Sequence, residues 1–356
     1  ATAQQGGWRS GEMEVKVFYE NKEDVEKIEE FRFDGDIYHD GTGIFFVIPE
    51  ELEKLESAGL KYEILKDDLN VYYRDFWSTR DEYHSYEEII QLMNSLALGH
   101  PSICEKHTFG TSVQGRELAA LKISDNVGTD EPEPEIGFDG GIHGDEIGGA
   151  ENLIRFAEFL CGNYGSDPEI TGLIDTREIW LYVMVNPDGR VNMTRENVNG
   201  VDRSGRWGYM WDAWGGSTGA YSQIETKKLR NCAYEHQFVV HTTYHSGTEY
   251  ISCPWSYRSD PPPDDTHILH LAGIYSSESG YANLEYGQGN TGMYAINGST
   301  KDGNYGVCGS VSWSMEISND KQPPASQLMM YYNRNYPSML AMIEHAGYGL
   351  EGVVTD

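Results

Sequence analysis

The sequence predicts an α/β fold, with a mixed central β-sheet and helices on both faces, preceded by a small α+β unit. Between about residues 78 and 347, apolar strand-like runs alternate with amphipathic helical runs, an order that builds a sheet covered on both sides. Residues 8 to about 66 instead follow the order β-α-β-β-α-β, which is typical of a ferredoxin-like domain. A chain of 356 residues is long enough to hold both units.

The first unit begins with a predicted strand at residues 14–19. Asn21 is a suitable N-cap for a helix that carries Val25, Ile28 and Phe31 on one face. Strands at 32–38 and 43–48 follow across a glycine-containing turn. Pro49 opens a second helix, which ends at Gly59 before a last strand at 60–65. We assign residues 1–77 to this unit and its linker.

The second unit, residues 78–347, holds the longer periodic runs. Strands are predicted at 117–123, 135–139, 178–185, 238–243 and 310–317. Helices are predicted at 86–98, 147–161, 222–235 and 326–346. The segment 255–305 is rich in Pro, Gly, Tyr, Ser and Asn, and we interpret it as long loops that rim a site.

The most informative motif is the pair His143 and Glu146 in Gly-Gly-Ile-His-Gly-Asp-Glu-Ile-Gly-Gly. It lies between a predicted strand and the start of an amphipathic helix, where both side chains can converge on one metal ion. Imidazole and carboxylate are ordinary zinc ligands, and a catalytic zinc site needs a third ligand and an open position for water. A His-x-x-Glu pair alone is weak evidence, because such pairs arise often by chance.

Further blocks follow in a fixed order, and together they resemble the zinc metallocarboxypeptidase family over about residues 78–347. These blocks are Asn186-Pro187-Asp188-Gly189, Arg195-Glu196-Asn197 with Gly200-Val201-Asp202, His245-Ser246-Gly247 with Pro254-Trp255, Tyr294 with Asp302, and Trp313-Ser314-Met315-Glu316. The resemblance implies a carboxypeptidase A-like catalytic domain that binds one Zn²⁺ ion and acts on a peptide or protein substrate.

Under this resemblance, His143, Glu146 and His245 are the zinc ligands. His241 is a rival for the third position, four residues earlier, but Ser246-Gly247 and Pro254-Trp255 stand where the family has their counterparts beside His245. Two neutral imidazoles and one carboxylate leave a coordination position for water, whose pKa zinc lowers toward neutrality.

The resemblance also assigns catalytic roles. Glu316, at the end of an apolar run, is the expected general base that passes a proton from water to the leaving nitrogen. Arg195 is expected to polarise the scissile carbonyl, and Tyr294 to close over the substrate. Asp202 is expected to orient His143 through its second ring nitrogen.

One segment departs from the family pattern. After Gly-Val-Asp, most members carry Leu-Asn-Arg-Asn, whose Asn-Arg pair grips the substrate's C-terminal carboxylate, whereas this chain has Arg203-Ser204-Gly205-Arg206. A bidentate Arg–carboxylate contact is strong and oriented, so its loss matters. Arg203, Ser204 and Arg206 are the candidates for substrate binding in its place.

Lys301 lies seven residues after Tyr294, where the family sets the pocket for the last side chain of the substrate. A lysine there favours an acidic C-terminal residue by simple charge complementarity. The alternative is a solvated loop lysine.

The resemblance extends to the flanking segments. Residues 1–77 look like the activation segment that precedes many secreted family members, so this unit is either a pro-domain that shields the site or a stabilising domain kept for life. Residues 348–356 resemble the start of the transthyretin-like domain that often follows this catalytic domain. We therefore expect a secreted or periplasmic protein whose signal peptide has been removed, and a zymogen if the first unit is a pro-domain.

Three functions remain open from the sequence. The first is a carboxypeptidase that removes one residue, with a preference for an acidic one. The second is a zinc amidase or endopeptidase on modified or cell-wall peptides, which the altered clamp motivates. The third is a zinc-binding pseudoenzyme.

Composition limits the classes of partner, membrane segment and disulfide pattern that the chain can have. The net charge of −31 argues against nucleic acid or an acidic membrane as the main partner. The sequence contains no apolar run near the roughly 18 residues of a transmembrane helix. Five widely spaced cysteines allow at most two disulfides within the chain, and the sequence does not choose the pairs or the oligomeric state.

Overall fold

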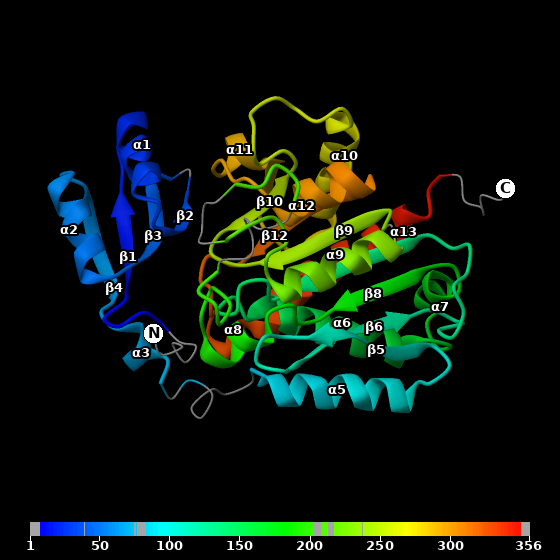
Figure 1. The fold of residues 1–356 in the computed structure, drawn as a ribbon. Coiled ribbons are helices and arrows are strands. Elements are labelled where there is room, and N and C mark those ends of the chain that lie inside the picture. Colours follow the sequence, from blue (N-terminus) through cyan, green and yellow to red (C-terminus); the bar gives the residue numbers. More distant parts are fainter. Residues whose placement is uncertain are drawn as a thin grey trace.

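In the computed structural model, residues 8–38, 40–74, 76, 83–201, 208–212, 217–236 and 238–349 are described. A small N-terminal unit lies beside a larger body built on one long sheet (Figure 1). We refer to residues 8–74 as the N-terminal unit. Its edge nearest to the larger body carries strand β2, Asp34–Ile37 (Figure 1).

The N-terminal unit contains a four-stranded antiparallel sheet in the order β2-β3-β1-β4. Its other strands are β1 Met13–Phe18, β3 Thr42–Val47 and β4 Lys61–Lys66, and its helices are α1 Lys22–Phe31 and α2 Pro49–Ser57. The predicted order β-α-β-β-α-β is the order found, and Asn21 caps α1 by accepting a hydrogen bond from Asp24 N. The ferredoxin-like assignment stays a prediction.

The core of the N-terminal unit is formed by every second side chain along its strands, because inward and outward positions alternate. Inward positions of β1 such as Val15 and Val17 pack against Ile28 of α1 and Leu55 of α2, because successive strand side chains point to opposite faces.

The larger body is built on an eight-stranded mixed sheet in the order β11-β10-β12-β9-β7-β8-β6-β5. Its strands are β5 Cys104–Thr111, β6 Glu117–Ile123, β7 Glu135–Gly140, β8 Glu178–Tyr182, β9 Val240–His245, β10 Glu249–Cys253, β11 Glu285–Gln288 and β12 Val311–Ile317. The strands β12, β9, β7 and β8 run parallel, so their carboxyl ends meet at one edge. In open α/β sheets, sites form at this edge.

Helices cover both faces of the long sheet, as predicted (Figure 1). One core joins the sheet to α5 Tyr86–Gly99, α6 Gly148–Asn163, α7 Pro168–Ile174, α10 Asp265–Glu278 and α13 Leu328–Ala346. A second core on the opposite face joins it to α9 Ile224–His236. Helix α6 buries the periodic apolar residues seen in the sequence, among them Leu153, Ile154, Ala157 and Leu160.

The interpretation of residues 255–305 as long loops is wrong in part. This segment contains the 14-residue helix α10, the strand β11, and the short helices α11 Gly289–Gly292 and α12 Thr300–Gly303. The buried residues of α10 have helical spacing, namely Ile268, Leu271, Ala272 and Tyr275. The preceding Pro261-Pro262-Pro263 run is more typical of a loop and obscures this helical pattern. The strands β5, β10 and β11 were also missed.

Two general findings complete the fold. None of the described helices is long and apolar enough to cross a membrane. The five cysteines, all within the described ranges, form no disulfide.

Candidate active site

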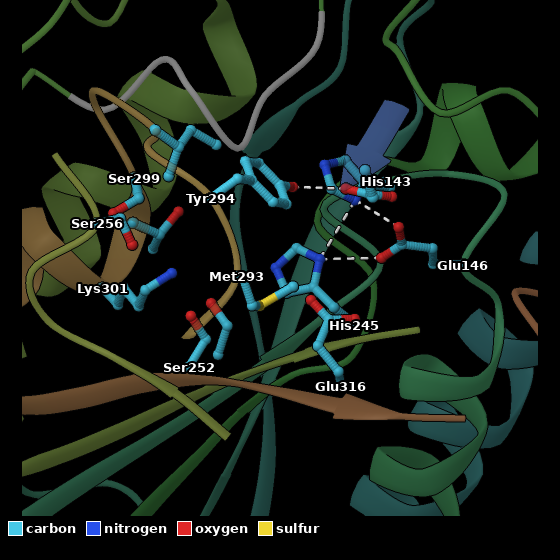
Figure 2. Close-up of a pocket in the computed structure, with 14 residues that line it drawn as sticks. His143, Glu146, His245, Ser252, Ser256, Met293, Tyr294, Ser299, Lys301 and Glu316 are labelled. Atoms are coloured by element: carbon cyan, nitrogen blue, oxygen red, sulfur yellow. Dashed lines mark hydrogen bonds and ion pairs between the residues drawn. The ribbon is translucent and has the colours of Figure 1, made fainter. Parts of the chain in front are cut away.

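The three predicted zinc ligands meet at the carboxyl edge of the parallel strands. His143 and Glu146 lie in the loop between β7 and α6, and His245 is the last residue of the neighbouring strand β9. All three are buried, and their ligand atoms lie within 4.8 Å of one another. Figure 2 shows the three side chains pointing toward one another. They form a candidate metal site.

The donor geometry fits a tetrahedral zinc ion. His143 Nδ1 lies 2.7 Å from Glu146 Oε1, and His245 Nδ1 lies 2.9 Å from Glu146 Oε2. The two Nδ1 atoms face each other at 3.2 Å. Two nitrogens held at about 2.0–2.1 Å from one tetrahedral zinc ion are separated by about 3.3 Å. Burial lowers the pKa of His245, which favours the neutral imidazole that a metal requires.

The rival His241 does not join this group. It lies earlier on β9, where its Nε2 is 3.0 Å from Asp139 and its Nδ1 is 2.9 Å from Asn304 Nδ2. His241 is therefore a buried histidine whose polar partners lie on β7 and just after α12.

Asn186 fixes the two loops that carry the ligands and Arg195. Its Oδ1 accepts from Gly189 N at the start of α8, Pro187–Asn192, and its Nδ2 donates to Ile142 O and Glu196 O at 3.2 Å. Gly144 lies so close to α8 that a Cβ atom would stand 2.1 Å from a backbone carbon of Gly189. Only glycine fits at this crossing.

Glu316 stands beside the metal ligands because of strand register. It pairs directly with His245 between the parallel strands β12 and β9, and its side chain lines the pocket. Burial raises the pKa of Glu316 well above its ordinary value, and the negative charges of Glu146 and Asp36 raise it further. Its place beside the candidate metal ligands makes Glu316 a candidate proton acceptor.

Arg195 is also buried at the site, with 1% of its surface exposed. Its Nη1 donates to Glu146 Oε1 at 3.1 Å. Its remaining nitrogens face the N-terminal unit, with Nε 3.0 Å from Asp34 Oδ1 and Nη2 3.4 Å from Asp36 Oδ1.

A pocket extends from the metal ligands past Tyr294 toward Lys301. Ser252, Ser256, Ser299 and Ser314 line it together with Met293. Lys301, on α12, is 6% exposed, and it lies at the far end from Glu146 in Figure 2. Burial lowers the pKa of Lys301, while Asp302 and Glu316 oppose that shift. Lys301 is thus a pocket residue rather than a solvated loop lysine.

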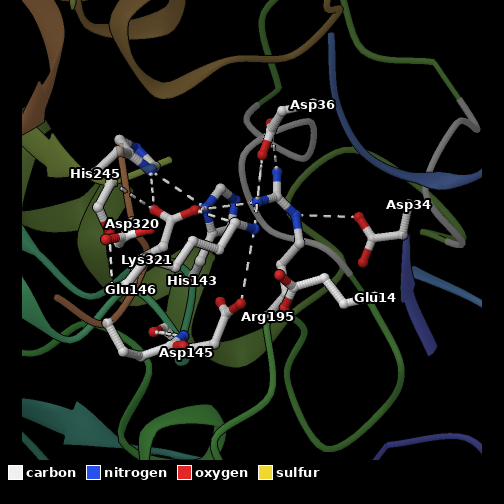
Figure 3. A network of polar contacts seen from close by, with 12 residues as sticks. Glu14, Asp34, Asp36, His143, Asp145, Glu146, Arg195, His245, Asp320 and Lys321 are labelled. Atoms are coloured by element: carbon white, nitrogen blue, oxygen red, sulfur yellow. Dashed lines mark hydrogen bonds and ion pairs between the residues drawn. The ribbon is translucent and has the colours of Figure 1, made fainter. Parts of the chain in front are cut away.

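The N-terminal unit reaches into this pocket through β2. Asp34 and Asp36 are two residues apart on a strand, so both side chains point to the same face, and that face meets Arg195 (Figure 3). The Tyr294 hydroxyl donates to Asp36 Oδ1 at 2.5 Å. Burial alone would raise the pKa of Asp36, but Arg195 and Lys321 lower it below its ordinary value.

An apolar contact supports this docking. Trp8, Phe46, Leu69 and Tyr73 of the N-terminal unit share one cluster with residues of the larger body, including Ile147. The Tyr73 hydroxyl also donates to Gln322 Oε1 at 2.6 Å. The acidic strand is therefore held by a packed interface.

Sequence reasoning missed several residues that the fold gathers here. Asp34 and Asp36 lie about 110 residues before the first metal ligand, and Lys321 and Asp145 gave no signal beyond their closeness to Glu316 and Glu146 in the chain. Lys321 Nζ is 3.6 Å from both Asp36 and Asp145 (Figure 3). An Asp-Gly-Asp triplet on a strand was the only available hint.

Four predicted residues lie outside the described part of the chain. Asp202, the expected partner of His143, and the candidate substrate-binding residues Arg203, Ser204 and Arg206 fall in residues 202–207. Their roles stay predictions.

The fold and the candidate metal site are those expected of the carboxypeptidase class of metallopeptidases. The sequence matches the zinc carboxypeptidase family over residues 89–338. The chain belongs to this family.

Relatives by sequence are carboxypeptidases. The chain is 27% identical to carboxypeptidase D of Mus musculus over 304 residues, which is 77% of this chain and 22% of that protein. It is 30% identical to carboxypeptidase SOL1 of Arabidopsis thaliana over 272 residues, which is 73% of this chain and 55% of the relative. The carboxypeptidase N catalytic chain of Homo sapiens is 26% identical over 324 residues, 77% of this chain and 71% of the relative. The chain thus spans about a fifth of the length of carboxypeptidase D.

Solved structures share the fold at low identity. The carboxypeptidase A from Helicoverpa armigera superposes with a TM-score of 0.80 at 16% identity, over 95% of this chain and 98% of that one. Thrombin activatable fibrinolysis inhibitor superposes with a TM-score of 0.78 at 17% identity, over 96% and 100%. Both comparisons cover the N-terminal unit as well as the larger body.

Proposed function

We propose that the protein is a zinc-dependent carboxypeptidase that hydrolyses the C-terminal peptide bond of peptides ending in an acidic residue, and that its N-terminal unit blocks the site. The observation that carries the proposal is the meeting of His143, Glu146 and His245 with Glu316 at one strand edge. Membership of the zinc carboxypeptidase family supports the same reaction.

His143, Glu146 and His245 would hold one zinc ion. When bound, zinc supplies Lewis-acid polarisation of a carbonyl and lowers the pKa of a coordinated water. Glu316 takes the proton of the attacking water and returns it to the leaving nitrogen, a role that its raised pKa favours. Arg195 donates hydrogen bonds to the oxygen on which negative charge develops.

Lys301 would select the departing residue. It is a buried cation at the far end of a pocket lined by four serines and a threonine, and the carboxylates of Asp36, Glu146 and Glu316 belong to the same lining. A carboxylate side chain that enters the pocket would meet this cation without competing bulk water, which strengthens their attraction. The pocket therefore favours glutamate or aspartate as the C-terminal residue.

The N-terminal unit would act as an inhibitor in the same chain. Asp36 engages both Arg195 and Tyr294, the two residues expected to contact the substrate. A substrate carbonyl and the Asp36 carboxylate cannot occupy the same donors together. Hydrolysis then requires that the N-terminal unit be cut from the larger body or move away from it.

The test compares the intact, zinc-loaded chain with the same protein nicked between the two units after folding. Matched peptides end in Glu, Leu or Lys, each as a free acid and as an amide, and products are identified by mass spectrometry with a chelated control. We expect the nicked protein to remove one residue from free acids in a chelator-sensitive reaction, and to turn over the Glu peptide fastest.

Other outcomes would revise the proposal. Equal turnover of amides or cleavage at internal bonds would favour a zinc amidase or endopeptidase, the reaction suggested by Ser204-Gly205 in place of the family's Asn-Arg pair. Retention of zinc without cleavage of any peptide would favour a pseudoenzyme. Preference for Lys or Leu would remove Lys301 as the specificity residue.

A further inference from the structure

Lys321 is a buried cation to which the proposed reaction gives no role. It is 9% exposed, and its Nζ lies 3.6 Å from Asp36 Oδ2, 3.6 Å from Asp145 Oδ2 and 3.7 Å from Glu146 Oε1. Within the described residues this ammonium group makes no hydrogen bond, although it has three N–H donors. A buried charge normally has hydrogen-bonded partners, so Lys321 has donors to spare.

Two contacts of Lys321 come from the N-terminal unit. One is the Asp36 carboxylate, and the other is the ring of Phe46, whose centroid is 4.4 Å from Nζ. When the N-terminal unit leaves, Lys321 loses both of these contacts, and Asp145 and Glu146 are its remaining ionic partners among the described residues. Its backbone stays fixed, because Ser246 Oγ donates to Lys321 O at 3.1 Å, next to the ligand His245.

The position of Asp36 marks a built anion site. Its Oδ1 accepts from Tyr294 and lies 3.4 Å from Arg195 Nη2, while its Oδ2 lies 3.5 Å from Arg195 Nη1 and 3.6 Å from Lys321 Nζ. Three donors from three separate segments of the larger body thus converge on one carboxylate.

This anion site lies upstream of the bond to be cleaved. Arg195 is the proposed partner of the scissile carbonyl, which belongs to the penultimate residue of the substrate. The side chain of that residue starts one atom away from the carbonyl carbon. Lys301 lies at the far end of the pocket that Asp36 also lines, and the charges that act on it are those of Asp302 and Glu316. The two lysines therefore face residues on opposite sides of the bond.

We infer that Lys321 recognises an acidic side chain on the penultimate residue, so that the substrates are peptides ending in two acidic residues. The inference rests on the proposed carboxypeptidase function and adds a second specificity residue to it. On this basis the Asp36 carboxylate occupies the place that the substrate's penultimate carboxylate takes after the N-terminal unit is released.

The test measures binding first, so that it does not depend on turnover. The full chain carrying Glu316→Gln is folded, loaded with zinc and nicked, and calorimetry compares acetyl-Ala-Glu-Glu with the nearly isosteric acetyl-Ala-Gln-Glu. We expect the Glu-Glu peptide to bind about tenfold more tightly. Lys321→Gln should reduce that ratio below about twofold, and Lys321→Arg should restore it. Lys227→Gln, which removes an exposed lysine on α9, serves as the matched control.

A merely structural role for Lys321 predicts a different result. If the lysine only balances Asp145 and Glu146, then Lys321→Gln weakens both peptides equally or releases zinc, which metal analysis detects. An unchanged ratio in Lys321→Gln, a ratio near one with Lys321 present, or no binding of either peptide would each overturn the inference.

Turnover by the nicked protein with Glu316 intact tests the proposed function separately. If it cleaves both peptides, a lower KM with similar kcat for the Glu-Glu peptide supports the role of Lys321. If it cleaves neither, the carboxypeptidase proposal fails while the binding ratio still decides the role of Lys321.

Discussion

His245 and Glu316 face the same pocket because β9 and β12 run parallel with these two residues paired in register. A shift of one residue along either strand would turn one side chain to the opposite face of the sheet. The proposed general base and the candidate metal ligand are thus placed by backbone pairing, and no long side chain has to reach across the site.

The substitution Glu316→Gln tests this placement. The amide keeps the size of the side chain but cannot accept the proton, so we expect zinc content to stay and hydrolysis by the nicked protein to fall at least about 100-fold. Metal analysis and the rate on a Glu-terminated peptide check both. Glu285→Gln, on the exposed face of β11, is the control and should change neither. A near-normal rate in Glu316→Gln would remove Glu316 as the base.

Among single residues, the sequence singled out the three members of the candidate metal site and Glu316, because each lies in a recognisable motif next to an apolar run. It missed Asp36 and Lys321, since their meeting depends on how two units dock, and no local pattern encodes that contact. The roles of Asp202 and of the Arg203–Arg206 segment stay predictions.

The strand β2 is the element that joins the two units. Gly35 separates its two aspartates and has φ +151°, and a Cβ there would stand 2.2 Å from Ile44 O of β3. Glycine therefore lets β2 lie close against β3 while Asp34 and Asp36 face Arg195. A Gly35→Ala change would displace Asp34 and Asp36 from Arg195 without altering any charge.

The substitution Asp36→Asn tests the block. The amide removes the negative charge that Arg195 and Lys321 attract, so the N-terminal unit should dock less tightly. We expect the intact chain to gain hydrolytic activity by about tenfold or more. Glu53→Gln, on the exposed side of α2, should leave the intact chain as inactive as before. If Asp36→Asn is equally inactive until nicked, Asp36 does not hold the block.

The loop between β6 and β7 carries a second titratable group of interest, Glu133. Partial burial raises its pKa to about 7, and Asp125 and Glu131 raise it as well. Because the folded state holds this proton more tightly than the unfolded chain, its contribution to stability is complete below about pH 4.3. That contribution is lost as the pH rises through about 7.

We therefore expect Glu133→Gln to raise the melting temperature relative to the wild type at pH 8, with the difference vanishing near pH 4.5. Thermal unfolding between these pH values measures it. Glu278→Gln, at an exposed position of α10, provides the control and should shift nothing. A difference that does not depend on pH would show that Glu133 does not titrate in this range.

For the whole molecule, zinc should stabilise the fold, because its three ligands come together only in the folded chain. Free zinc at 100 times its dissociation constant should raise the free energy of unfolding by about 2.7 kcal/mol. Removal by a chelator should lower the melting temperature, and zinc should restore it. In His245→Ala the shift should disappear. Equal melting temperatures of the wild type with and without zinc would contradict the ligand assignment.

The class of fold was predictable because long runs with clear periodicity became β6, β7, α6 and α13 with ends close to those expected. Prediction failed where signals were short or masked by prolines, as in α10 and β11. The strand order of the long sheet was also beyond the sequence, since pairings such as β9 with β12 join segments about 70 residues apart.

The docking of β2 has a consequence for how the block responds to protein concentration. While both units belong to one chain, the Asp36 carboxylate is held near Arg195 at an effective concentration in the millimolar range, whatever the dilution. One cut in the connecting segment turns this into an ordinary two-body equilibrium. When the same fraction of molecules has been cut, specific activity should then rise as the protein is diluted. The cut protein stays blocked at high protein concentration and becomes active at low concentration.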